Sequence, residues 1–357
     1  MNVIVDLDKI KDNIKIIRKT TKKDVIAVVK SNAYGLGAKA IIKTLLKENI
    51  NYFFFNKFNE YLEVKDLLVC KNIIIYESLT KEQINTYYTP NLILSIKSIS
   101  DAYKYSSTNI KLRVHLEIDS GMNRCGIRSV YECRKIIEII KDNLIIDGIY
   151  THFASGTSEF DYYNYQVEKF KKFLNLYPFN IIHSANTQSL HKELVGNMVR
   201  VGMSMYGYHS RLLLKPAVSV YSKLINIINL NKGDKVGYNS LYEAKTSELL
   251  GIVDIGYFDI RDIDKIYYLN KPYKFIGKRC MNHSFILIDS EINLLSRLSL
   301  LPKFGIIDTD EYDYYKILTS LDHVKKNYLE RDNYEIYNIF KPTSKKSWKR
   351  RIRKRSY

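Results

Sequence analysis

The stretch Val28-Val29-Lys30-Ser31-Asn32-Ala33-Tyr34-Gly35-Leu36-Gly37 is the most informative part of the chain, and an apolar run over 24–29 leads into it. A short continuous apolar run is typical of a strand buried on both faces. Lys30 then stands at the carboxyl end of a buried strand, where barrel enzymes assemble their active sites. Desolvation there lowers the pKa of a lysine towards the neutral, nucleophilic amine that a Schiff base requires.

Two plainer interpretations stay open at this point. From spacing alone, a lysine that extends its ammonium group into solvent at the strand end is the more common outcome. Gly35 and Gly37 are compatible with a phosphate-binding turn and equally with an ordinary loop before a helix.

Strand-like and helical segments alternate on both sides of this stretch. The helical pattern over 37–48 has one apolar face that contains Ile41, Ile42 and Leu45, and a second helix is expected over 57–67. Further strands are expected at 52–55, 72–75, 91–95, 111–118, 145–151 and 180–183. Repeated strand–helix units predict a parallel sheet with right-handed crossovers, and about eight units close into a (β/α)8 TIM-type barrel.

The pattern changes near 213–216. Beyond this point the apolar runs are short and closely spaced, at 218–227, 235–236, 249–255, 273–276 and 285–289. Such spacing predicts a mostly antiparallel β domain. The expected division is a barrel over 1–214, a β domain over 215–340 and a flexible basic tail over 341–357.

Composition limits the class of protein. With 46% hydrophobic and 26% charged residues among 357, the chain can build a core, so intrinsic disorder is excluded as its main state. No apolar stretch approaches the ~18 residues that cross a bilayer, and the N-terminal residues include charge from the start, so a cytoplasmic protein is expected. Four scattered cysteines and seven histidines lack metal-ligand spacing, so no metal site is expected.

The formal net charge of +18 admits a nucleic-acid-associated protein as a non-enzyme alternative. Half of that excess lies in the tail, because residues 341–357 contain nine Lys or Arg and no acidic residue. Blocks of like charge are commonly solvated or disordered, so we expect no nucleic-acid partner.

Eight motifs resemble those of one enzyme family, in its order and spacing. Residues 28–37 closely resemble the pyridoxal-phosphate lysine motif of the alanine racemases. The other motifs are 115–128 (HLEIDSGMNRCGIR), 151–154 (THFA), 183–187 (HSANT), 197–207 (NMVRVGMSMYG), 236–242 (VGYNSLY), 255–257 (IGY) and 280–281 (CM). Because the similarity runs from about residue 2 to 340, it is far more specific than any single motif.

The resemblance implies a two-base mechanism on a pyridoxal 5'-phosphate aldimine. Lys30 matches the lysine that binds the cofactor and acts as the base on one face of the substrate, and Tyr238 matches the base on the other face. Arg124, His152 and Arg200 match the groups that would polarise a tyrosine whose ordinary pKa is near ~10. In the family, each site is completed across a homodimer.

The resemblance also assigns the residues that bind the cofactor and the substrate. Arg200 matches the hydrogen-bond donor to the pyridine nitrogen, and Arg124 matches the contact to the phenolic oxygen and the substrate carboxylate. The phosphate positions are Tyr34, Thr187, Tyr257 and the backbone of Gly202 and Met203. The backbone amide of Met281 matches the position that takes the substrate carboxylate.

Glu117 occupies the position at which the family commonly has a carbamylated lysine. A glutamate can supply the same negative charge, so we predict a Glu117–Arg124 ion pair and no carbamylation. The alternative is a solvated glutamate on the outer face of a strand.

Some positions depart from the family pattern. Asn282 replaces an aspartate, Lys278 replaces an arginine at the entrance, and residues 258–260 (FDI) replace a glycine turn. Residues 341–350 do not resemble the family's C-terminal segment, which contributes an entrance tyrosine.

These features together predict an alanine racemase that interconverts L- and D-alanine and supplies D-alanine for peptidoglycan. A racemase of serine or of a broader set of small amino acids is the alternative. A decarboxylase of the same fold is a further rival, against which the motifs around Arg200 and Tyr238 argue.

Overall fold

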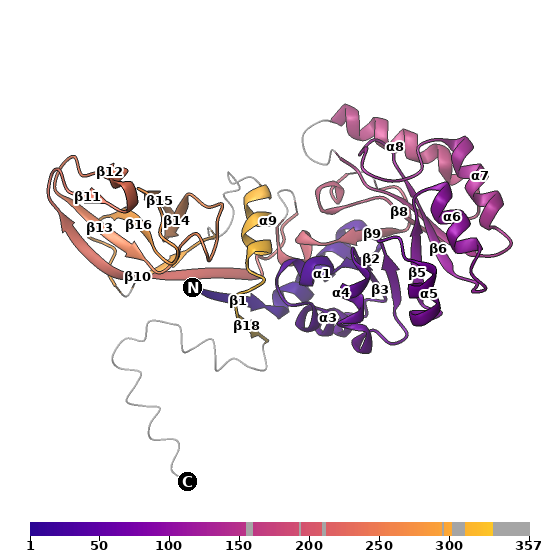
Figure 1. Cartoon of the computed structure of the whole chain (residues 1–357), viewed down its shortest axis with the longest axis horizontal. Helices are drawn as coiled ribbons and strands as arrows, with labels where there is room; N and C mark the ends of the chain where they lie inside the picture. The colour runs from indigo at the N-terminus through magenta and orange to yellow at the C-terminus, as the bar shows by residue number, and fades with distance from the viewer. Residues whose placement is uncertain (155–159, 193, 209–211, 295, 302–310, 331–357) are drawn as a thin grey trace, which may run out of the picture.

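The computed structural model describes residues 1–154, 160–192, 194–208, 212–294, 296–301 and 311–330. Eight parallel strands, consecutive in the chain, close into a barrel at one end of an elongated molecule (Figure 1). They are β2 (Asp24–Val28), β3 (Tyr52–Phe55), β4 (Asn72–Ile75), β5 (Leu92–Ile96), β6 (Arg113–Ile118), β7 (Ile145–Thr151), β8 (Ile181–His183) and β9 (Met198–Val201). The predicted barrel is confirmed.

Helices connect most of the barrel strands and cover the outside of the barrel (Figure 1). They are α1 (Leu7–Thr21), α3 (Ala38–Lys47), α4 (Phe58–Leu62), α5 (Lys81–Tyr87), α6 (Ile99–Ser106), α7 (Val130–Ile140) and α8 (Phe160–Leu174), with short 3-10 turns η1 (Lys65–Leu67), η2 (Thr187–Ser189) and η3 (Met203–Tyr206). The single helix expected over 57–67 is wrong in detail, because the chain leaves the helical conformation at the buried, β-branched Val64, between α4 and η1.

Strand β9 closes the barrel between β8 and β2, and the sequence patterns did not reveal it. It pairs with β2 over four residues and with β8 through His183 and Met198 alone. All four of its residues are buried, including Arg200. A four-residue strand with a central arginine lacks both the apolar run and the alternation that identify longer strands.

The second part of the chain forms an eight-stranded sheet in the order β13-β16-β15-β14-β17-β10-β1-β18 and a small β11–β12 pair. Its pairings are antiparallel except for the parallel pair β1–β18. The elements are β10 (Val218–Leu230), β11 (Lys235–Val236), η4 (Tyr238–Ser240), β12 (Tyr242–Glu243), β13 (Glu248–Val253), β14 (Lys265–Tyr268), β15 (Lys271–Ile276), β16 (Ser284–Ile288), β17 (Arg297–Ser299), α9 (Glu311–Ser320) and β18 (Lys326–Leu329). The predicted antiparallel part is confirmed.

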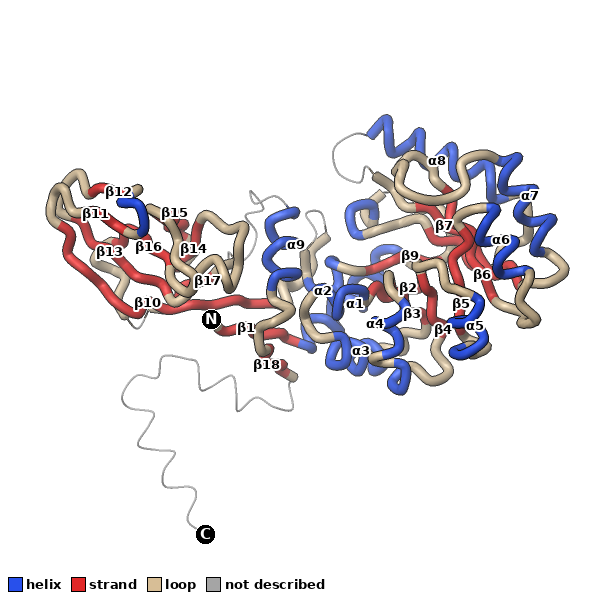
Figure 2. The backbone as a smooth tube through the Cα atoms, in the orientation of Figure 1, coloured by secondary structure: helices blue, strands red, loops and turns tan. Residues whose placement is uncertain are grey.

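The N-terminal strand β1 (Asn2–Asp6) belongs to this second sheet. It pairs antiparallel with β10 and parallel with β18, and Figure 2 shows it running beside the long β10. The expected division assigned residues 1–214 to the barrel, so the structure places residues 2–6 differently. The boundary near 214 stays a prediction.

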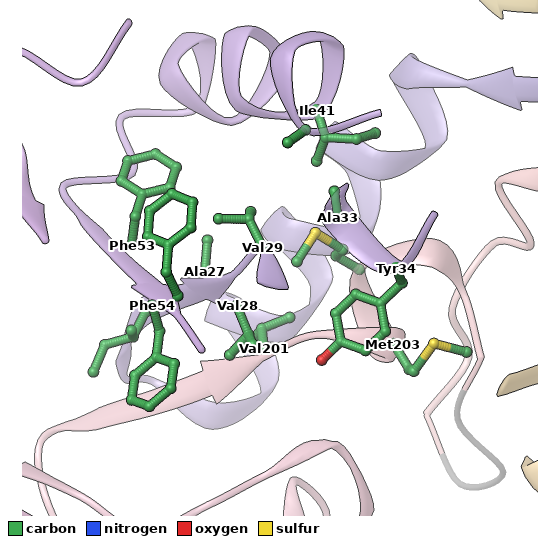
Figure 3. Packing of buried hydrophobic residues seen from close by; sticks show 14 of the residues in the cluster. Ala27, Val28, Val29, Ala33, Tyr34, Ile41, Phe53, Phe54, Val201 and Met203 are labelled. Atoms are coloured by element: carbon green, nitrogen blue, oxygen red, sulfur yellow. The ribbon is translucent and has the colours of Figure 1, made fainter. Parts of the chain in front are cut away.

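A continuous apolar core supports the end of β2, where Lys30 follows. Figure 3 shows Val28, Tyr34, Val201 and Met203 packed together there, and all four side chains are buried. Full burial stabilises a side chain such as valine by about 1.5–3 kcal/mol. Within the described residues, no helix is both long and apolar enough to span a membrane.

Candidate active site

Lys30 lies directly beyond β2, at the start of the five-residue element α2 (Lys30–Tyr34). Its side chain is partly buried, and its Nζ lies 5.8 Å from the centroid of the Tyr34 ring. Burial and the nearby charge of Arg124 lower the pKa of Lys30, although Glu60 opposes this shift. The environment therefore shifts Lys30 towards the neutral amine, which is the direction that a Schiff-base lysine requires.

The backbone after Lys30 forms a left-handed turn. Residues 31, 32, 33 and 34 have φ angles of 52°, 51°, 54° and 60°, and none of them is glycine. This conformation costs about 1–2 kcal/mol for each such residue. Hydrogen bonds hold it: the Ser31 amide donates to Glu60 Oε1 (2.8 Å), and Tyr206 Oη donates to the Ala33 carbonyl (3.0 Å). Strain of this kind is typical of functional sites.

The C-terminal strap, defined here as residues 318–330, packs against this turn. Asn32 Nδ2 donates to Asp322 Oδ1 (2.7 Å), and Tyr328 Oη donates to the Leu36 carbonyl (2.9 Å). A Cβ on Gly35 would lie 2.8 Å from the Leu318 carbonyl oxygen, and a Cβ on Gly37 would overlap the Tyr328 hydroxyl. Both glycines therefore make room for the strap.

The predicted phosphate residues of the barrel lie together. The Tyr34 hydroxyl lies so close to Gly202 that a Cβ there would overlap it. Met203 is the next residue, and Thr187 Oγ1 lies 3.3 Å from Ser204 Oγ. Ser204 was not among the predicted residues, although it lies inside the 197–207 motif. Hydroxyl groups and backbone amides of this kind suit a phosphate.

Arg200, on β9, is buried against the carboxyl ends of β7 and β8. Its Nη1 donates to His183 Nδ1 and to the His183 carbonyl (both 2.9 Å), and its Nη2 donates to the Thr151 carbonyl (2.7 Å). Burial lowers the pKa of Arg200 to about 10, so the guanidinium stays charged at neutral pH. The predicted contact to a pyridine nitrogen requires a hydrogen-bond donor that is held in place and keeps its proton, and the Arg200 guanidinium is such a group.

His152 contacts Arg200 and lies within the electrostatic influence of Arg124 and Lys30. Its Nδ1 lies 3.3 Å from Arg200 Nη2, and burial together with the charges of Arg200, Arg124 and Lys30 lowers its pKa well below the ordinary value. The imidazole is therefore neutral. Three basic side chains thus surround one histidine, which makes this end of the barrel suited to an anionic ligand.

Glu117 and Arg124 form the predicted ion pair, with 3.9 Å between Glu117 Oε1 and Arg124 Nη2. Glu117 is only 2% exposed, so the alternative of a solvated glutamate is wrong. The single long contact differs from the bidentate geometry expected of a carbamate substitute. Tyr150, which was not among the predicted residues, donates from Oη to Glu117 Oε2 (3.2 Å).

The remaining predicted residues lie in the antiparallel part. Tyr238, Tyr257 and Met281 are 62%, 43% and 53% exposed. Tyr238 follows β11, at the end of the molecule remote from the barrel (Figure 1). The structure thus brings together the barrel residues Lys30, Tyr34, Glu117, Arg124, His152, Thr187, Arg200, Gly202 and Met203, whereas Tyr238 lies far from Lys30 within one chain.

The departures from the family pattern also lie on the surface of this part. Lys278, Phe258 and Asn282 are exposed, and the Phe258 ring makes an edge contact with His323 (centroids 5.9 Å apart). The basic tail over 341–357 lies outside the described residues.

A closed parallel barrel with a desolvated lysine, a buried arginine and a cluster of hydroxyl groups beyond or near the ends of its strands has the layout of a barrel enzyme. Family models agree: "Alanine racemase, N-terminal domain" matches residues 5–210 and "Alanine racemase, C-terminal domain" matches residues 217–313. The chain belongs to the alanine racemase family.

Individual relatives support the same assignment. Over 275 residues the chain is 34% identical to an alanine racemase of Streptococcus uberis, which covers 71% of this chain and 74% of the relative. The alanine racemase of Bacillus anthracis with bound L-Ala-P is 26% identical, with a TM-score of 0.78 over 92% of this chain and 95% of that chain. That of Bartonella henselae with covalently bound pyridoxal phosphate is 22% identical and supports the fold alone (TM-score 0.82, 92% and 99% covered).

Proposed function

We propose that this protein interconverts L- and D-alanine with pyridoxal 5'-phosphate as its cofactor. The observation that supports this most is the desolvated Lys30, which lies next to a left-handed turn and within reach of the charge of Arg124. Membership of the family and the fit of the barrel residues to an anionic aromatic group support the same activity.

The barrel residues fit the cofactor in their chemistry. Tyr34, Thr187 and the backbone of Gly202 and Met203 would hold the phosphate, and Arg200 would donate to the pyridine nitrogen. When bound through a lysine, pyridoxal phosphate delocalises the electron pair that is left when an amino acid loses its α-proton. Arg200 keeps its own proton, so the pyridine nitrogen stays unprotonated.

Inversion requires proton donors and acceptors on both faces of the substrate. In one direction Lys30 Nζ takes the α-proton from one face and Tyr238 Oη gives a proton to the other face. In the reverse direction the two groups exchange roles. His152, Arg124 and Arg200 would polarise Tyr238. The two arginines are cations, which stabilise a phenolate, and His152 is neutral and buried.

The two bases belong to different chains in this proposal. Tyr238 is largely exposed and remote from the barrel, and Tyr257 and Met281 are exposed in the same part of the chain. A homodimer in which this part of one chain meets the barrel mouth of its partner would complete two equivalent sites. We therefore propose a homodimer with shared active sites.

The cellular role follows from the reaction. We infer that the enzyme works in the cytoplasm and supplies D-alanine for peptidoglycan. Serine is the second candidate substrate, because Asn282 follows the substrate-binding position Met281 where the family usually has an acidic residue.

Replacement of Lys30 tests the proposal directly. The purified protein with pyridoxal phosphate should show visible absorbance from the covalently bound cofactor and should racemise L-alanine. Lys30→Ala should lose both, whereas Lys39→Ala, on the outside helix α3, should keep both. A wild-type protein that stays colourless with added cofactor would overturn the proposed function.

A further inference from the structure

Tyr150 on β7 takes no part in the proposed chemistry, although it is buried beside the residues that do. The strand register places it next to Glu117 on β6 and next to His183 on β8. Its ring stacks on the His183 ring, with centroids 4.7 Å and planes 8° apart. The guanidinium carbon of Arg200 lies 5.5 Å from the centroid of the same ring. Packing therefore holds the Tyr150 ring in an orientation from which its hydroxyl reaches Glu117.

The Tyr150 hydroxyl lies between two buried polar groups. Its Oη is 3.0 Å from Ser95 Oγ and 3.2 Å from Glu117 Oε2. An ionised carboxylate can only accept hydrogen bonds, so the phenol proton is donated to Glu117 whenever Glu117 is charged. The Ser95 hydroxyl, which can donate as well as accept, then donates to Tyr150 Oη. Ser95 thereby supports a phenol that donates to the carboxylate.

The two oxygens of Glu117 have different partners. Oε2 accepts from Tyr150, and Oε1 faces Arg124 Nη2 at 3.9 Å. Because a carboxylate is planar, a donor that holds one oxygen also fixes the direction of the other. Tyr150 therefore orients Glu117 towards Arg124, which the proposed function assigns to the phenolic oxygen of the cofactor and to the substrate carboxylate.

The hydroxyl also affects the charge of Glu117. Burial raises the pKa of this carboxyl to about 7, and Arg124 and the hydrogen bond from Tyr150 oppose that shift. The cations that act on Glu117 are Arg124, Lys97 and Arg200, and Tyr76 is a further phenol within its influence. A hydrogen bond to the charged form of a carboxyl favours that form. Without the hydroxyl, more of Glu117 would be protonated near neutral pH, and a protonated Glu117 gives Arg124 no counter-charge.

Two other roles for Tyr150 fit less well. To exchange protons with a substrate it would have to form a phenolate, but burial and the charge of Glu117 raise its pKa well above the ordinary value. As a residue that only fills the core it would not need its hydroxyl, and phenylalanine would serve equally well.

We propose that Tyr150 is a positioning residue for Arg124: its hydroxyl holds one carboxylate oxygen of Glu117, so that the other oxygen and the negative charge stay directed at Arg124. The inference rests on the proposed function, because the role of Arg124 does.

Tyr150→Phe keeps the ring and removes only the hydroxyl. Loss of a hydrogen bond to a charged group should raise the pKa of Glu117 by about one pH unit. From a wild-type pKa of about 7, the ionised fraction then falls about fivefold at about pH 7 and hardly at all at about pH 9. We expect kcat/KM for alanine to fall by about fivefold relative to wild type at about pH 7, and to return to within about 1.5-fold at about pH 9.

A purely structural role predicts a loss that does not depend on pH. A loss of the same size at every pH, or no loss at about pH 7, would overturn the proposal. In a Glu117→Gln background, Tyr150→Phe should have no pH-dependent effect, because the titrating group is gone, and a pH-dependent effect that persists there would also overturn it. Tyr105→Phe, which removes the hydroxyl of another buried tyrosine, on the outside helix α6, should keep the wild-type pH profile.

The titration of Glu117 itself provides a test that needs no activity. In purified protein labelled with 13C at the glutamate carboxyl carbons, the NMR signal of Glu117 is identified by its loss in Glu117→Gln. Its titration midpoint should lie about one pH unit higher in Tyr150→Phe than in wild type. Equal midpoints would overturn the proposal. The expected difference in a protein that neither binds cofactor nor racemises would leave the pairing of Tyr150 with Glu117 standing and refute the proposed function instead.

Discussion

Glu117 is a buried carboxyl whose titration should be visible in the stability of the protein. Burial raises its pKa to about 7, although Arg124 and Tyr150 oppose this shift. The pKa of an unfolded glutamate is near ~4.3, so between about pH 4.5 and 7 the folded state holds a proton that the unfolded state has released. The stability linked to Glu117 is therefore complete at low pH and is lost as the pH rises through this range, by about 3 kcal/mol.

Glu117→Gln should remove this dependence. We expect the free energy of unfolding of wild type, from denaturant titrations, to fall relative to that of Glu117→Gln between about pH 4.5 and 7. Glu138→Gln, which removes only the exposed partner of Lys141, should retain the wild-type dependence. Parallel pH profiles for wild type and Glu117→Gln would contradict the burial of an ionisable carboxyl at this site.

Single residues of the site were predictable to different extents. Lys30, Arg200 and the Glu117–Arg124 pair were predicted from motifs that resemble those of the alanine racemases, and Lys30 also from its place directly after an apolar run. The contact of Tyr150 with Glu117 was not predictable, since a buried tyrosine in a strand is ordinary in a chain with 30 tyrosines. Hydrogen-bond partners from different strands depend on the barrel register, which no local pattern contains.

At the scale of elements, the left-handed turn after Lys30 depends on the C-terminal strap. Gly37 has φ +93°, and a Cβ there would meet the Tyr328 hydroxyl. Gly233 also has φ +93° but has no atom within 4 Å of the position of a Cβ. Alanine at either glycine would strain the backbone equally, but only alanine at Gly37 would also meet the strap. A comparison of the two substitutions therefore separates the cost of backbone strain from the cost of the lost contact.

Gly37→Ala should destabilise the protein more than Gly233→Ala does, by about 1–3 kcal/mol in chemical unfolding. Tyr328→Phe removes the hydroxyl, and with it a hydrogen bond worth about 0.5–1.5 kcal/mol. The double variant Gly37→Ala/Tyr328→Phe should lose less than the sum of the two single losses, because the overlapping atom is gone. Strict additivity would show that the strap does not contact Gly37.

The barrel was predictable where strands are continuous apolar runs, as at 52–55 and 72–75. Strand β9 was not predictable, because Arg200 interrupts it. The turn over 31–34 was not predictable either, because Asn32 alone among its four residues favours positive φ. The membership of β1 in the antiparallel sheet was not predictable either. It depends on β10 and β18, which are more than 200 residues away in sequence.

At the scale of the whole molecule, the two expected bases lie in separate parts of an elongated chain. The element α2, which begins at Lys30, lies beside α9 near the middle (Figure 2), whereas β11, which Tyr238 follows, lies at the far end of the antiparallel part (Figure 1). Lys30 lies at the mouth of the barrel, and Tyr238 lies beyond β11 with more than half of its surface exposed. One chain alone therefore does not bring the two expected bases together. We propose that a second copy of the chain supplies the other base.

Mixing two inactive variants tests this claim most directly. Lys30→Ala and Tyr238→Phe should each be inactive as homodimers, and in the mixed dimer one site combines the intact Lys30 of one chain with the intact Tyr238 of the other. After unfolding and refolding at equal concentrations, half of the dimers should be mixed, so racemase activity should recover to about a quarter of the wild-type value. No recovery, in a mixture in which mixed dimers are demonstrated by mass spectrometry, would contradict the shared site.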